Sequence, residues 1–134
     1  MKTLYFDCFC GISGDMTVAA LIDAGADGEA IRRALEGLGV AGLTCKAERI
    51  NKRGISAMRF QVVAPDAPQP HRHLKDVVAI LDAADLPAPV QRAAVETFEL
   101  LARAEAEVHD TTVDKVHFHE VGAVDSIVDI IGAN

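Results

Sequence analysis

The sequence LTCKAERINKRGISAMRFQVVA, residues 43–64, predicts a β-hairpin between helical segments and therefore indicates a mixed fold of helices and sheet. In its second half, apolar side chains alternate with Arg59 and Gln61, which is the period of a strand with one buried face. The residues between the two halves would join them as a hairpin loop. We therefore expect strands at 43–50 and 56–64 and a loop at 51–54.

Helical spacing and cap residues predict helices on both sides of this hairpin. Gly25 stands where one helix needs a C-terminal cap, Asp27 can cap the start of the next helix, and Gly39 can stop it. Three prolines in residues 65–70 predict a surface linker, because proline interrupts helices and central strands. The remaining expected elements are helices at 15–24, 27–38, 74–84, 90–108 and 126–133, the last capped by Asp125, and strands at 3–9 and 115–121.

This order of elements predicts an α/β domain, with α+β as the alternative, in which helices cover a small sheet of about four strands. With 134 residues, half of them hydrophobic and a quarter charged, the chain has room for one domain spanning residues 1–134. Three cysteines favour a reducing compartment over a disulfide framework. No apolar run reaches the length of a membrane span, so we expect a cytoplasmic protein without a membrane partner.

Charge is distributed unevenly along the chain. Residues 46–75 hold seven basic and two acidic side chains, a local balance of +5, whereas the whole chain has a net charge of −7. A basic island in an acidic protein suits a small anionic ligand, although an ordinary solvated hairpin has the same composition. The acidic balance and the scarcity of aromatic residues disfavour nucleic-acid binding, which needs a basic surface or a stacking platform.

Four of the five histidines form two closely spaced pairs, His71 with His73 and His117 with His119. On an extended strand alternate side chains share a face, so His117 and His119 would lie about 7 Å apart, as two imidazoles around one metal can. Glu120 would face the other side of that strand. Imidazole suits nickel, zinc, copper or iron rather than calcium or magnesium. Each pair has a plain alternative, a polar strand face or a solvated loop.

The sequence DCFCGISGDM, residues 7–16, is the densest group of chemically active residues. If a strand continues through Cys10, both thiols of the stretch share one face, opposite Asp7. The glycines would let backbone N–H groups approach an anion at a helix N-terminus, but neither a Walker nor a dinucleotide-binding spacing is present. The alternatives are core cysteines with Ser13 or Asp15 as a helix cap, a serine hydrolase that lacks the nucleophile-elbow pattern, or a Cys/His thiol enzyme.

Three blocks of the sequence resemble the LarC family of nickel insertion proteins: YFDCFCGISGDM at residues 5–16, HRHLKD at 71–76 and VHFHEVGAVDSIVDI at 116–130. The blocks occur in the family's order and spacing and span nearly the whole chain. Members of the family insert nickel into pyridinium-3,5-bisthiocarboxylic acid mononucleotide, which completes the nickel-pincer cofactor of lactate racemase and related enzymes. The resemblance therefore implies a nickel chelatase, or cyclometallase, of the lyase type.

The resemblance also implies roles for the candidate residues. The expected nickel ligands are His71, His73, His117, His119 and Glu120. The expected catalytic residues are Asp7, Cys8 and Asp15. Sulfur is a ligand that nickel accepts, and loss of a pyridinium C–H proton requires a base, for which Asp7, Asp15, His119 and Glu120 are all eligible. The residues expected to meet the mononucleotide and its phosphate are Gly11, Ser13, Gly14 and Arg53.

The resemblance covers the N-terminal portion of the family. Full-length members continue past Asn134 into a region that binds CTP with a divalent metal, so the chain resembles an N-terminal nickel-binding module. We expect it to form a homo-oligomer or to contact that C-terminal part. The alternative is a non-catalytic nickel-delivery or scaffold module, and an unrelated metal-dependent hydrolase is a weaker third hypothesis, because no hydrolase signature fits. Binding of the mononucleotide distinguishes the first two.

Overall fold

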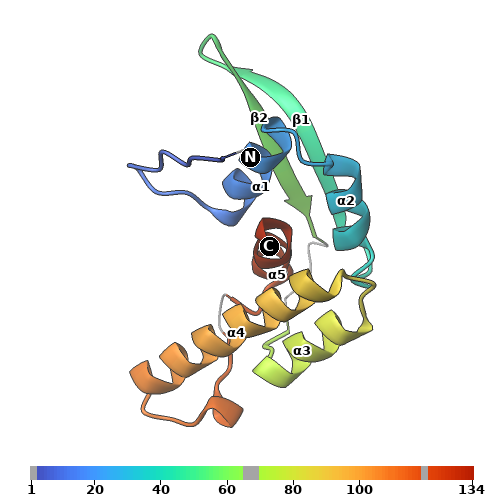
Figure 1. Cartoon of the computed structure of the whole chain (residues 1–134). Coiled ribbons are helices and arrows are strands. Elements are labelled where there is room, and N and C mark those ends of the chain that lie inside the picture. The colour runs from blue at the N-terminus through green and yellow to red at the C-terminus, as the bar shows by residue number, and fades with distance from the viewer. Residues whose placement is uncertain (1–2, 65–69, 119–120) are drawn as a thin grey trace.

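A computed structural model describes residues 3–64, 70–118 and 121–134 of the chain (Figure 1). Within these residues it contains five α-helices, one short 3-10 helix and one antiparallel pair of strands, which confirms a mixed helix-and-sheet fold. In chain order the elements are α1 (Gly14–Asp23), α2 (Gly28–Glu36), β1 (Thr44–Lys52), β2 (Ile55–Val63), α3 (Leu74–Ala83), α4 (Ala88–Val108), η1 (Val113–Lys115) and α5 (Val124–Ala133). Most of the predicted linker, residues 65–69, lies outside the described residues.

The predicted hairpin is present, and its turn is tighter than expected. Strands β1 and β2 pair antiparallel from Thr44 opposite Val63 to Lys52 opposite Ile55. The two turn residues between the strands both have positive φ, 55° at Arg53 and 86° at Gly54. This turn type matches the right-handed twist of the strands, so two residues suffice where a four-residue loop was predicted.

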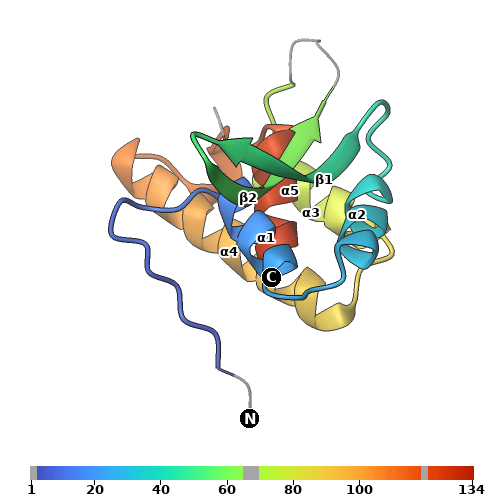
Figure 2. The same cartoon turned by 90° about the horizontal axis from the view of Figure 1, so that it is seen from above.

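Helix α5 lies at the centre of the core (Figures 1 and 2). Its buried side chains recur at three- and four-residue intervals: Val124, Ile127, Val128 and Ile131. Helices α1, α2 and α4 pack against α5, and α1 also packs against β2. Two glycines permit the close contact of α1 and α5, because a Cβ on Gly14 would lie 2.3 Å from Asp129 Cβ and a Cβ on Gly132 would lie 2.8 Å from a methyl group of Val18.

The helix ends follow the sequence at most positions. The Asp27 carboxylate caps α2 by accepting hydrogen bonds from the backbone N–H groups of Glu29 and Ala30, both at 3.0 Å. Gly25 follows α1 with a φ of 107°, which is the left-handed geometry that ends many helices. The predicted cap of α5 was wrong, because this helix begins earlier and Asp125 lies in its first turn.

Two of the four predicted strands do not form in the described part of the chain. Residues 3–8 are extended without a paired strand, and the predicted strand 115–121 begins inside η1. In that second segment, Phe118 makes one isolated antiparallel bridge to Arg72. An extended segment becomes a strand when a neighbouring backbone offers a continuous ladder of hydrogen bonds. The described residues offer such a ladder to β1 and β2 alone, so a four-stranded sheet is not confirmed.

Candidate metal centre

The backbone before α3 and the backbone after η1 cross at the bridge between Arg72 and Phe118. Phe118 N donates a hydrogen bond to Arg72 O at 3.0 Å, and the Arg72 guanidinium donates to Gly122 O at 2.6 Å. A Cβ on Gly122 would lie 2.9 Å from Phe118 Cβ, so glycine is needed for this close approach. The buried Phe118 ring packs on Phe98 of α4, with 6.0 Å between ring centroids. We call residues 71–73 together with residues 116–118 the histidine crossing.

The histidine crossing brings one histidine from each sequence pair into contact. The rings of His73 and His117 lie 4.0 Å apart between centroids, tilted by 44°. His73 Nδ1 lies 2.8 Å from Val116 O. A carbonyl oxygen can only accept a hydrogen bond, so Nδ1 is the donor, and in the neutral ring Nε2 is the nitrogen with the lone pair. Metal-binding histidines are commonly oriented in this way, by donating their second ring N–H to a carbonyl or carboxylate.

The backbone of His73 is fixed as well as its ring. His73 is the residue that precedes α3, and its N–H donates to Asp76 Oδ2 at 2.8 Å, which is one half of a capping box. The side chain of His73 is half-buried, whereas that of His117 is exposed. One ring of the pair is therefore held by the fold and the other faces solvent, where a ligand can reach it.

Within the described residues, no other predicted metal ligand joins this pair. His71 is exposed at the start of the histidine crossing. His119 and Glu120 lie outside the described residues, so their role remains a prediction. Among residues 3–64, 70–118 and 121–134, no group of three or more His, Cys, Asp or Glu side chains is placed to hold a metal ion. The described residues thus bring two imidazole rings together without a third metal-ligating side chain.

A hollow of about 570 Å³ lies beside His73, between α3 and η1. Its polar lining comes from His73, Lys75, Asp82 and Asp114, and the rest of its lining is apolar and includes Val78 and Val113. The Lys75 ammonium is the one cation of this lining. The hollow adjoins the histidine crossing at His73, so a molecule bound there would lie next to this side chain.

A second cluster of polar groups forms where α1 and α5 begin. Asp15, Asp125 and Asp129, the carboxylate corner, line a hollow of about 380 Å³ together with Arg59 of β2. Burial, and then the carboxylates of Asp15 and Asp125, raise the pKa of Asp129 to about 6, while a hydrogen bond from the Asp15 backbone N–H opposes this shift. Among the described residues, Asp129 Oδ1 is buried without a hydrogen-bond partner.

The carboxylate corner lies where the sequence predicted a phosphate-binding site. The sequence places Gly11, Ser13 and Gly14 around the N-terminus of α1 to receive an anion, but the structure fills that end with the Asp129 carboxylate. The Ser13 hydroxyl donates to Asp15 Oδ1, and Gly11 N donates to Cys8 O at 2.8 Å. These groups already have partners inside the chain, and their contact with a mononucleotide remains a prediction.

The predicted catalytic residues Asp7 and Cys8 lie on the extended segment before α1. Asp7 is exposed and Cys8 is half-buried. The expectation that a strand carries Cys8 and Cys10 on one face was wrong, because a turn from Cys8 to Gly11 interrupts the extended backbone and Gly11 adopts a φ of 85°. The third predicted residue, Asp15, belongs to the carboxylate corner. Arg53 lies at the tip of the hairpin, at the far end of the molecule from α3 (Figure 1).

Residues 4–134 match the family model described as nickel insertion protein. The chain belongs to this family. The match confirms the resemblance to LarC proteins. A relative from Citrifermentans bemidjiense, named as a candidate nickel insertion protein, is 48% identical over 132 residues, which are 98% of this chain and 34% of the relative. The pyridinium-3,5-bisthiocarboxylic acid mononucleotide nickel insertion protein of Desulfitobacterium hafniense is 45% identical over 133 residues, 99% of this chain and 33% of the relative.

The chain spans about a third of the length of these curated relatives of the nickel insertion family. No solved structure matches the chain. None of the helices that the structure describes is both long and apolar enough to cross a membrane.

Sequence reasoning missed two members of the carboxylate corner, Asp125 and Asp129. A signal for them was present, because the two aspartates stand four residues apart in a helix whose other positions are mainly apolar, so they share one face. The pairing of His73 with His117 had no comparable signal, since the two residues are far apart in sequence. Their contact depends on how Arg72 and Phe118 meet in the fold.

Proposed function

We propose that the chain binds nickel(II) and takes part in its insertion into pyridinium-3,5-bisthiocarboxylic acid mononucleotide, with His73 and His117 as the described part of the nickel site. The observation that carries the proposal is the contact of these two imidazoles, together with the Val116 carbonyl that leaves His73 Nε2 as the free nitrogen. Nickel(II) accepts imidazole nitrogen and stands high in the affinity series of divalent metals. Membership of the nickel insertion family and the name of the Desulfitobacterium relative support the choice of metal and substrate.

The insertion requires two kinds of group besides the histidines. Two nickel–sulfur bonds form to the thiocarboxylates, and a pyridinium C–H bond is replaced by a nickel–carbon bond, so a base must accept the proton that leaves. Asp7, Asp15, His119 and Glu120 remain our candidates for this base, with Cys8 as a further sulfur donor to nickel. A site with two protein ligands suits a metal that is passed on, since the remaining coordination positions are open to the sulfurs of the substrate.

The second candidate function is a nickel-delivery module that performs no chemistry of its own. This alternative is favoured by one observation, that the described residues bring no third metal-ligating side chain to the histidine pair. A delivery module would bind nickel through the histidines and release it to a partner. It would not bind the pyridinium mononucleotide, whereas an insertion module would.

The test is a calorimetric titration of the chain with nickel(II), with zinc and magnesium as comparison metals. We expect His73→Ala and His117→Ala each to weaken nickel binding by at least about tenfold, because either change removes one of two ligands. His109→Ala is the matched control, since His109 ends α4 and pairs with Glu105 outside the histidine crossing. Unchanged nickel binding in both crossing variants would move the site elsewhere and contradict the proposal.

Two further measurements separate the possible outcomes. Circular dichroism checks that His73→Ala still folds, and His117→Ala is the safer variant because the His117 side chain is exposed. A second titration, with the pyridinium mononucleotide as ligand, distinguishes the two functions. Binding of the mononucleotide supports insertion, and nickel binding without it supports delivery. The same nickel titration of His71→Ala, His119→Ala and Glu120→Gln tests the remaining predicted ligands.

A further inference from the structure

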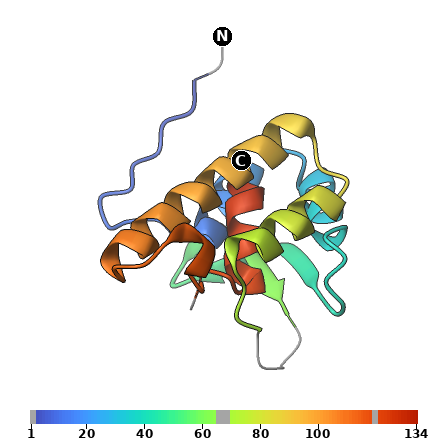
Figure 3. The same cartoon turned by 90° about the horizontal axis from the view of Figure 1, so that it is seen from below.

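The first described residues form an arm that leaves the body of the protein. Residues 3–12, called the arm from here on, extend away from the packed helices before the chain turns into α1 (Figures 2 and 3). Within the described residues, the one backbone hydrogen bond of the arm joins Gly11 N to Cys8 O, both inside the arm itself. Residues 3–8 of the arm are therefore an extended segment without a paired strand, and a turn connects them to the start of α1.

The side chains of the arm are those of a buried strand. Large apolar groups are exposed along it, with Tyr5 at 84% and Phe9 at 90% exposure. Successive side chains of a strand point to opposite faces, so Leu4 and Phe6 belong to one face and Tyr5 to the other, while Phe9 lies in the turn that follows. A strand with two apolar faces is typical of a sheet that is covered on both sides, as parallel sheets are. The arm is also followed directly by a helix, as a strand of such a sheet commonly is.

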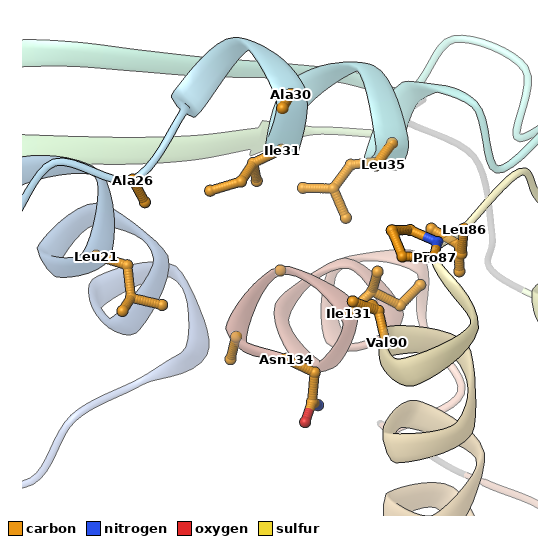
Figure 4. Close-up of a pocket in the computed structure, with 13 residues that line it drawn as sticks. Leu21, Ala26, Ala30, Ile31, Leu35, Leu86, Pro87, Val90, Ile131 and Asn134 are labelled. Carbon is orange, nitrogen blue, oxygen red and sulfur yellow. The ribbon is translucent and has the colours of Figure 1, made fainter.

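The position of the arm indicates where its partner lies. The arm and the C-terminal end of α5 are on the same side of the body (Figures 2 and 3). An apolar groove of about 410 Å³ opens at that end of α5, and Figure 4 shows Leu21, Ile31, Leu35, Val90 and Ile131 around it. The curated relatives are about three times as long as the chain, so most of the family's structure lies outside residues 1–134.

We propose that residues 3–8 of the arm form a β-strand of a second sheet, whose other strands belong to the part of the family's protein that lies outside residues 1–134. Main-chain hydrogen bonds to an open edge strand of that part would hold the arm, and packing on both faces would cover its aromatic side chains. The same part would cover the apolar groove beside α5. Docking of the arm would also hold Asp7 and Cys8 in one fixed place.

The experiment compares amide hydrogen exchange in the 134-residue chain and in the full-length relative from Desulfitobacterium hafniense. We expect the arm amides of the chain to exchange at unprotected rates at low protein concentration. In the full-length relative, the stretch aligned with the arm should exchange at least about 100-fold more slowly. Fast exchange in both proteins overturns the proposal. Protection in the 134-residue chain together with the mass of a dimer also overturns it, because the partner is then a second copy.

Matched substitutions give a second readout. In the 134-residue chain, Tyr5→Ser should leave the unfolding midpoint unchanged, as should the control Val108→Ser, whose side chain is 79% exposed at the end of α4. In the full-length relative, substitution at the position aligned with Tyr5 should lower the midpoint, while the position aligned with Val108 should tolerate the change. Equal tolerance at both positions contradicts the proposal. Neither measurement uses nickel, so its outcome is independent of the proposed metal site.

Discussion

The histidine crossing is packed into the protein and the arm is exposed, although both belong to the blocks that carry the family resemblance. Phe118 of the histidine crossing is 1% exposed and packs on Phe98, whereas Phe9 of the arm is 90% exposed. Hydrogen bonds join the crossing to residues distant in sequence, while the arm has one hydrogen bond within itself. The arm holds more reactive side chains than the histidine crossing, yet the described residues do not pack against it. The position of a motif in the fold therefore depends on the residues that pack against it and not on its own composition.

This difference separates two requirements of the proposed reaction. The histidine pair proposed to bind nickel is preorganised, because the Val116 carbonyl orients His73 and the buried Phe118 fixes the neighbouring backbone. The residues proposed for proton transfer and sulfur donation, Asp7 and Cys8, lie on a segment that the described residues do not pack. Catalytic groups must be held close to their productive geometry to contribute to rate. We therefore expect nickel binding to need less of the full-length protein than insertion needs.

The strongest test of the comparison replaces the same residue type in both regions. Phe118→Ala should lower the free energy of unfolding by about 3–5 kcal/mol, the usual cost of removing a buried phenylalanine. Phe9→Ala should change it by less than about 0.5 kcal/mol, because the ring is almost fully exposed and loses no packing. Urea unfolding of the 134-residue chain measures both. Similar losses from the two substitutions would show that the arm is packed in solution.

A smaller effect is expected from glycine substitutions in the two regions. Gly122→Ala should cost about 1–3 kcal/mol of stability, because its Cβ would be forced to within 2.9 Å of Phe118 Cβ. Gly11→Ala should cost about 1 kcal/mol or less, since no atom lies within 4 Å of its Cβ position and the strain of its positive φ can be relieved by a change in the turn. Urea unfolding provides the comparison, and nickel titration of Gly122→Ala should show weaker binding as the crossing is displaced. Full stability of Gly122→Ala would contradict the described crossing.

The smallest effect concerns the junction of the arm with the body, where Asp15 N–H meets the Asp129 carboxylate. The raised pKa of Asp129 means that the native state keeps a proton that the unfolded chain releases. The stability from this proton is complete below the ordinary pKa of 3.8 and is lost as the pH rises through about 6. Asp129→Asn should therefore raise the free energy of unfolding near neutral pH by about 1 kcal/mol, after allowance for solvent screening.

This prediction is checked by urea unfolding at about pH 4 and about pH 7.5, on either side of the expected transition. At the lower pH the Asp129→Asn variant and the original chain should be almost equally stable. Asp114→Asn, an exposed aspartate in η1, is the control and should show no such difference between the two pH values. If the free energy of unfolding of the original chain increased from the lower to the higher pH, the effect would have the opposite sign. That result would contradict the raised pKa of Asp129.

Local signals explain which elements could be predicted. The alternation of residues 56–64, the Asp27 cap and the glycine after α1 each act within a few residues of the structure that they produce, and each prediction was confirmed. The predicted strands at 3–9 and 115–121 had equally suitable side chains, but a strand also needs a neighbouring backbone. The candidate site shows the same division, since the histidine pairs were visible in the sequence whereas the contact of His73 with His117 was not.

The helices, the hairpin, the family and the residue types that can bind nickel could all be inferred from the amino-acid sequence, because periodicity, caps and motifs are short-range properties. The tertiary structure decided which histidines meet, that Asp129 fills the N-terminal end of α1, and that the arm is left without a partner. Those outcomes depend on segments far apart in the chain, held by the buried Phe118, the Arg72 hydrogen bonds and the packing of α1 on α5. The residue pattern of one segment cannot predict these contacts, because each contact also depends on the surface of the other segment.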